Sequence, residues 1–125
     1  MATAYTVPAI LRVTRSTQSG LFTMTAAWQV VYTNSAPYAW LFVSADINLT
    51  PMIAGDTIDI RVRKINVSGG AEVVHSLMTY SDVQPVNHPA VRIGPLMDVY
   101  GVEVAMRQTA GVLADIQCEF FDAFR

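Results

Sequence analysis

Residues 100–121 read YGVEVAMRQTAGVLADIQCEFF, and this stretch sets the pattern for the chain. Apolar residues occupy every second position on both sides of a turn at residues 109–111. They are Val102, Val104 and Met106 before the turn, and Ile116, Cys118 and Phe120 after it. A period of two residues is that of a β-strand with one buried face. The stretch therefore predicts two half-buried strands, and the short turn predicts that they pair as a β-hairpin.

The same alternation recurs along most of the chain, and turn-forming residues interrupt it every ten to fifteen residues. Strands are predicted near residues 5–14, 21–33, 39–49, 57–66, 71–80, 90–94, 98–108 and 112–122. A short helix over residues 20–31 is the alternative there, but the β-branched residues of that stretch favour a strand. We predict one all-β domain over residues 1–125, an antiparallel two-sheet β-sandwich of about eight strands with jelly-roll-like connections.

The composition is unusually apolar: 52% of the residues are hydrophobic and 14% are charged, with Lys64 as the single lysine. A small monomer has too much surface for so few charges, so a homo-oligomer is expected. The net charge of −2 argues against nucleic-acid binding. The sequence shows no signal peptide and no apolar run long enough to span a membrane, so we expect synthesis in a cytoplasm and no membrane partner.

Few residues point to chemistry. His75, His88 and Asp82 are the candidates for metal ligands, and Ser76 would complete a hydrolase triad with His88 and Asp82. Neither the ligand spacing of a cupin-like enzyme nor a nucleophile elbow is present, so we predict no metal, no cofactor and no catalytic residue. His75 is expected to be a partly buried strand residue, and Cys118 a buried, inert thiol.

Charged residues on the predicted strands fall on outward faces, where solvated cross-strand ion pairs are the expectation. They are Glu103, Asp115 and Glu119 among the carboxylates, and Arg61, Arg63 and Arg107 among the guanidinium groups. The Gly69-Gly70 pair predicts a hairpin turn between two strands. The triplets beginning at Asn48 and Asn66 match the glycosylation pattern, and no function is assigned to them.

Aromatic residues provide the candidate contact surface. Strict alternation places Trp40 and Phe42 on the face opposite Leu41, Val43 and Ala45, directly after a loop that contains Tyr38. Three alternatives remain open: the rings belong to the core, they form a subunit interface, or they stack sugar rings, with Trp28 as a further platform. The interface candidates are Trp40, Phe42 and Tyr38, and substitution of Trp40 or Phe42 is expected to affect association more than folding.

Two segments carry a family resemblance. Residues 54–62, AGDTIDIRV, followed by the Gly-Gly turn and by residues 100–111, YGVEVAMRQTAG, resemble the small jelly-roll and β-sandwich structural proteins of tailed phages and archaeal viruses. The resemblance implies a virion component, such as a capsid decoration protein, that binds the major capsid or other virion proteins and often forms trimers. It carries over no individual binding residue.

The sequence thus leads to a non-enzymatic structural protein of a virus particle, a capsid decoration, cement or related shell component, located in the virion and forming a homo-oligomer, with a trimer favoured. The alternative is a carbohydrate-binding module or a receptor-binding fibre head domain, in which Trp40 and Tyr38 would stack on sugars. A small cupin-like enzyme comes third, distinguished by whether metal copurifies with the protein.

Overall fold

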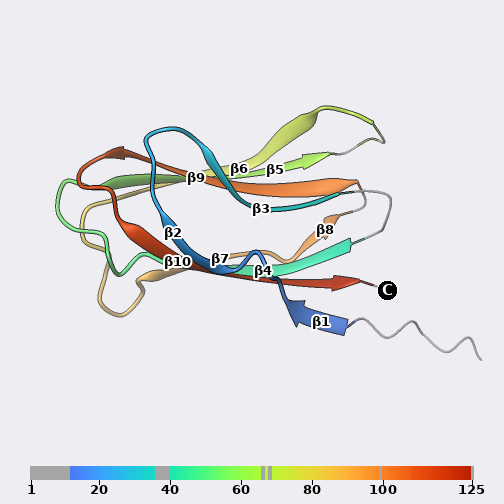
Figure 1. The fold of residues 1–125 in the computed structure, drawn as a ribbon, viewed down its shortest axis with the longest axis horizontal. Coiled ribbons are helices and arrows are strands. Elements are labelled where there is room, and N and C mark those ends of the chain that lie inside the picture. The colour runs from blue at the N-terminus through green and yellow to red at the C-terminus, as the bar shows by residue number, and fades with distance from the viewer. Residues whose placement is uncertain (1–11, 36–39, 66, 68, 99, 125) are drawn as a thin grey trace, which may run out of the picture.

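The computed structural model describes residues 12–35, 40–65, 67, 69–98 and 100–124, which form ten strands and no helix. Two antiparallel sheets face each other across one core (Figure 1). The strands are β1 (Arg12–Arg15), β2 (Gly20–Thr23), β3 (Gln29–Ser35), β4 (Trp40–Asn48), β5 (Thr57–Ile65), β6 (Glu72–Ser81), β7 (Ala90–Ile93), β8 (Leu96–Asp98), β9 (Gly101–Ala110) and β10 (Asp115–Phe124). The described residues contain no helix long and apolar enough to cross a membrane.

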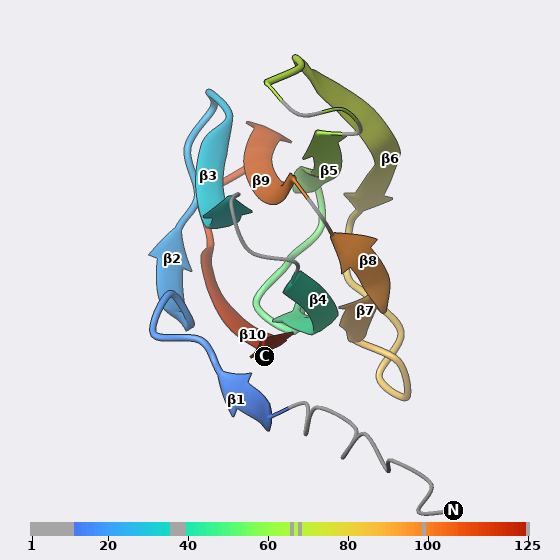
Figure 2. The same cartoon turned by 90° about the vertical axis from the view of Figure 1, so that its right-hand side faces the viewer.

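The order of the strands is that of a jelly roll. In the six-stranded sheet, β10 pairs with β1 and β2 on one side and with β4 on the other, and β4 also pairs with β7 and β8. The four-stranded sheet has the order β3-β9-β5-β6. Figure 2 shows the two sheets end-on, one above the other. Because β1 with β2, and β7 with β8, each occupy one strand position, the layout is two facing groups of four, which confirms the predicted β-sandwich.

The structure differs from the predicted strand arrangement in two places. Residues 21–33 form two strands instead of one, with β2 in the six-stranded sheet and β3 in the four-stranded sheet. Likewise β9 and β10 do not pair as a hairpin, since β9 lies between β3 and β5 while β10 lies between β1/β2 and β4. Residues 111–114 cross from one sheet to the other. The predicted hairpin at Gly69-Gly70 is correct, because β5 pairs with β6.

The core lies between the sheets, and the faces predicted for β9 and β10 are correct. The six alternating residues of these strands named above are all buried. Three aromatic rings form the middle of the core: the Tyr32 ring lies 5.1 Å, centroid to centroid, from the rings of both Phe42 and Phe120. β9 and β10 therefore direct their apolar faces at each other across the core instead of lying side by side.

Bulges interrupt the alternation elsewhere. On β4, Ser44 pairs with Phe121 and Phe42 with Asp122, which leaves Val43 as an extra residue. On β6, Ser76 pairs with Val62 and Val74 with Arg63, which leaves His75 extra. A bulge shifts the side-chain alternation by one residue, so the faces predicted beyond it are inverted.

Candidate functional site

Of the three predicted aromatic contact residues, the structure describes the side chain of Phe42 alone. Phe42 is 0% exposed and lies in the core, since the bulge at Val43 turns Phe42 and Ala45 to the same side. The prediction that its ring lies on an outward face, opposite Ala45, is therefore wrong. Trp40 begins β4, but its side chain, like all of Tyr38, lies outside the described residues. A contact role for Trp40 and Tyr38 stays a prediction.

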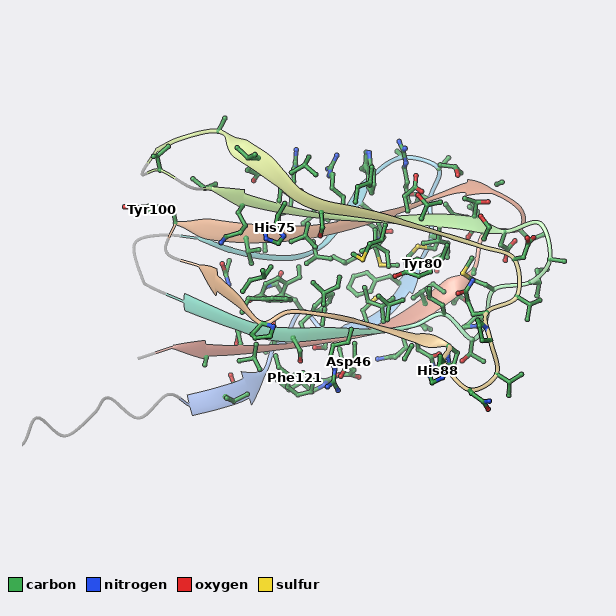
Figure 3. The ribbon with its side chains drawn as sticks, turned by 180° about the vertical axis from the view of Figure 1, so that it is seen from behind. Asp46, His75, Tyr80, His88, Tyr100 and Phe121 are labelled. Carbon is green, nitrogen blue, oxygen red and sulfur yellow. The ribbon has the colours of Figure 1, made fainter. Side chains whose placement is uncertain are left out.

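The candidates for chemistry do not converge. His75 is on β6 of the four-stranded sheet, and His88 is in the loop before β7, which belongs to the other sheet (Figure 3). His75 is exposed and not partly buried as expected, because the bulge removes it from the regular alternation. Asp82 accepts a hydrogen bond of 2.8 Å from the Gly55 N–H, and Ser76 lies opposite Val62. The described residues contain no group of three or more potential metal ligands.

Cys118 is a buried thiol, as the sequence predicts. Its Sγ lies 3.7 Å from Sδ of Met106 on the facing strand. Burial, with a smaller contribution from the charge of Glu119, raises the pKa of the Cys118 thiol to about 12. The thiol is therefore protonated, and a protonated thiol is a poor nucleophile.

Charged side chains gather on the outer face of the four-stranded sheet, in what we call the outer charge cluster. Its members are Asp59, Arg61, Arg63, Glu72, Glu103 and Arg107. Arg107 donates to Asp59 at 2.8 Å, and Arg63 contacts both Glu103 at 2.6 Å and Glu72 at 2.8 Å. The expected cross-strand pairs thus form. They are less solvated than expected, because the side chains of Asp59 and Glu103 are each only 10% exposed.

Trp28 covers part of this cluster. The guanidinium carbons of Arg61 and Arg107 lie 4.2 and 4.4 Å from the centroid of its ring, within the range of cation–π attraction. Burial raises the pKa of Asp59. Hydrogen bonds from Thr79 and Arg107 and the charge of Arg107 lower it by more, so the pKa of Asp59 is below its usual value. With three acidic and three basic members, the cluster is a charge-balanced face held in place by its own contacts.

A second arrangement lies at one end of the sandwich, where the loops of residues 49–56, 82–89 and 111–114 gather (Figure 1, left). Asp56, 1% exposed, connects them. Its Oδ1 accepts from the Val112 N–H at 3.0 Å, its Oδ2 accepts from the Ile53 N–H at 3.0 Å, and its main-chain carbonyl accepts from the Asp82 N–H at 2.8 Å. One buried residue thus connects three loops, through its carboxylate and its main-chain carbonyl.

Gln108 holds the same end from inside. Its side-chain amide donates to the carbonyls of Ala110 and Val112, at 3.0 and 2.7 Å, and accepts from the Ala114 N–H at 2.9 Å. Gly111 completes the packing, since a Cβ there would lie 2.0 Å from Oδ1 of Asp56. Nothing in the sequence had pointed to the side chains of Asp56 and Gln108 as loop contacts, although a Gly55-Asp56 pair before a strand is a common turn signal.

The clamped loops present apolar side chains to solvent. We call this surface the loop-end patch, formed by Ile53, Val83, Val86, Val112 and Leu113, each more than half exposed. Every large hydrophobic residue exposed in the described part of the chain is aliphatic. The rings of Tyr32, Phe42 and Phe120 are in the core, and that of Trp28 packs against two arginines. The other described aromatic residues are half-buried: Phe22, Tyr80, Tyr100 and Phe121. Exposed apolar surfaces of this kind are typical of sites where proteins contact one another.

Comparisons with known proteins give low similarity. No family model matches the sequence, and no curated protein matches it significantly. Among solved structures, a chain of the T13 viral particle of infectious bursal disease virus is 10% identical with a TM-score of 0.43, covering 100% of this chain and 36% of that chain. A chain of the Gx strain of the same virus is 10% identical with a TM-score of 0.41, covering 99% of this chain and 38% of that chain. This chain therefore spans little more than a third of the length of each.

Proposed function

We propose that the protein is a non-enzymatic structural component of a virus particle, a decoration, cement or related shell protein that works through contacts with its own copies and with other virion proteins. The observation that carries the proposal is the loop-end patch on a jelly-roll frame. Jelly rolls occur in capsid proteins, lectins and cupins, so the fold alone does not select among these functions. The choice among these functions therefore depends on the chemistry of the exposed side chains.

The chemistry of the exposed surface favours contact between proteins over sugar binding. Sugar rings stack on flat aromatic side chains, whereas the loop-end patch consists of valine, leucine and isoleucine. Aliphatic side chains gain most when another apolar surface excludes water from them. The patch is therefore suited to a subunit interface, and the resemblance to virion proteins leads us to propose threefold association through it.

The clamp beneath the patch strengthens this interpretation. Asp56 and Gln108 fix the loops by hydrogen bonds before any partner arrives. A surface that is ordered beforehand loses little conformational entropy on binding, so more of the contact energy remains as affinity. Repetition of such contacts over a particle multiplies weak single interactions.

Size-exclusion chromatography with light scattering, over a concentration series, tests the proposal. We expect an oligomer at micromolar concentration, and we expect Val112→Asp to shift it to smaller species because the patch then carries buried charge. Val13→Asp, on a similarly exposed valine of β1, is the matched control and should leave the mass unchanged. Negative-stain electron microscopy shows whether the oligomers continue into rings or shells.

Two outcomes would overturn the proposal. A 13.7 kDa monomer at every concentration would remove the subunit contacts on which the proposal rests. Specific binding to a glycan array by that monomer would favour the carbohydrate-binding alternative. Gene order offers an independent check, since adjacent major capsid and terminase genes are expected for a virion protein.

A further inference from the structure

The two edges of the four-stranded sheet differ. At the β3 edge, the side-chain amide of Gln18 takes the place of a neighbouring strand. Its Nε2 donates to the Thr33 carbonyl at 2.8 Å, and its Oε1 accepts from the Thr33 N–H at 3.0 Å. The hydrogen-bonding groups at the middle of β3 are thus already occupied, which protects this edge from pairing with another strand.

The β6 edge has no comparable protection. β6 is ten residues long, about 33 Å by the rise of a strand, and it pairs with β5 alone among the described strands. It contains no proline or lysine, and Glu72 is its single acidic or basic residue apart from His75. Figure 2 shows β6 at the outer end of its sheet. Long edges without charge are those that pair with another chain.

The side chains beside this edge are also apolar. Val74 and Leu77 lie opposite Arg63 and Arg61 of β5, so they share the outer face with the outer charge cluster. Their side chains are 54% and 59% exposed. Two apolar side chains are thus open to solvent beside the charged groups of the same face. A strand added beyond β6 would cover both side chains and satisfy the free backbone groups in one step.

We propose that β6 of one copy pairs antiparallel with β6 of a second copy around a twofold axis, joining two four-stranded sheets into one of eight strands. This inference rests on the proposed function, because it names one of the contacts by which the subunits associate. Antiparallel pairing of a strand with itself satisfies the condition of a twofold interface, in which the same surface serves both partners.

Two observations favour β6 of a second copy as the partner: the position of the Glu72 charge on β6 and the protection of the β3 edge by Gln18. Antiparallel pairing places the two Glu72 carboxylates at opposite ends of the interface, and each already has a partner in Arg63 at 2.8 Å. Pairing of β6 with β3 of another copy would continue indefinitely as a fibre. Gln18 obstructs that arrangement by occupying Thr33, so the closed twofold pair remains.

Leu77→Lys tests the contact, because lysine on an edge strand opposes pairing. We expect the dissociation constant of the twofold contact to rise at least tenfold, and the mass in light scattering to fall by half. Val30→Lys on β3, at a residue 49% exposed, is the matched control and should not change the mass. Unchanged thermal unfolding of the Leu77→Lys monomer shows that the fold is retained.

Single cysteines along β6 give a second, independent measurement. The natural Cys118 is buried and is the chain's one cysteine, so the surface has no other thiol to compete. Strand neighbours across an antiparallel pair have Cα atoms about 4.5–5.5 Å apart, which a disulfide spans. Mild oxidation should link dimers only at positions beside the twofold axis, among His75→Cys, Leu77→Cys and Thr79→Cys, and not in Val30→Cys.

The outcomes separate this inference from the proposed function. An oligomer that survives Leu77→Lys and forms no β6 cross-link, but dissociates with Val112→Asp, overturns the β6 pairing and leaves the virion proposal in place. A discrete β6 dimer that never forms larger assemblies supports the pairing and contradicts the particle role. If Leu77→Lys reduces the mass of the oligomer by half and Val112→Asp reduces it to a third, the β6 pairing and the contact through the loop-end patch are both supported.

Discussion

The connection between β5 and β6 and the connection between β9 and β10 look alike in sequence and differ in space. Each joins two alternating strands through a few residues that include glycine. The first is a hairpin within one sheet, and the second crosses between the sheets. The difference teaches that alternation determines which side of a strand is buried, whereas the contacts of the loop determine which strands become neighbours.

The crossing loop is held by specific side chains, whereas the described residues of the hairpin loop, 67 and 69–71, show no such side-chain bond. In residues 111–114, the Val112 N–H donates to the Asp56 carboxylate and the Ala114 N–H donates to Gln108. The Val112 carbonyl accepts from the Gln108 amide, and both Asp56 and Gln108 are buried. In the hairpin loop, the described contact is a local bond of 2.9 Å from the Gly70 N–H to the Val67 carbonyl. Substitutions in the two connections should therefore have very different effects.

The largest effect is expected for Asp56→Ala. It removes the acceptor for two backbone N–H groups and leaves them unsatisfied at a buried site, which should lower the free energy of unfolding by about 4 kcal/mol. Urea unfolding followed by circular dichroism measures this. A loss of less than about 1 kcal/mol would mean that the crossing loop does not depend on the clamp.

Two glycines offer a matched comparison. Gly111 and Gly69 both have positive φ, +88° and +70°, but a Cβ on Gly111 would meet Asp56 whereas one on Gly69 meets nothing within 4 Å. Gly69→Ala carries only the backbone penalty, about 1 kcal/mol, and Gly111→Ala adds the overlap for a total of about 3 kcal/mol. Equal values for the two variants would contradict the difference between the loops.

Asp59→Asn tests whether an ion pair helps to hold β9 beside β5. Its ion pair with Arg107 joins these strands at directly opposite positions. The lowered pKa of Asp59 means that the carboxylate stabilises the fold above the unfolded pKa of about 3.9, and that this contribution disappears as the pH falls through the folded pKa. We expect a loss of about 2 kcal/mol near neutral pH that vanishes in acid. A loss independent of pH would point to packing instead of charge.

The smallest effects concern the two faces of β10. Cys118→Ser places a hydroxyl in the core and should lower the free energy of unfolding by about 1 to 2 kcal/mol, whereas Asp115→Ala on the exposed face should cost within about 0.5 kcal/mol. With its pKa raised to about 12, Cys118 should resist thiol reagents in the native state and react once denatured. Rapid labelling of the native protein would show that the faces of β10 are reversed.

Bulges explain where the sequence reading of the strands was incomplete. Cys118, Ile116 and Phe120 are buried as predicted because β10 alternates without interruption through them. Phe42 was assigned to the wrong face, since the extra residue Val43 lies just after it. Val43 and His75 lie inside continuous strand stretches, residues 40–48 and 72–81, that contain no glycine or proline, so the sequence contains no local signal that an extra residue is present.

The sequence by itself determined the all-β class, the positions of most strands, the buried face of β9 and β10 and the burial of Cys118. These follow from a period of two residues, which each strand carries on its own. The tertiary structure alone decided that β9 and β10 lie in opposite sheets, that Phe42 is in the core, and that Asp56 joins three loops. The physical reason is that strand pairing, bulges and loop clamps depend on groups far apart in the chain, which only the folded molecule brings within hydrogen-bonding distance.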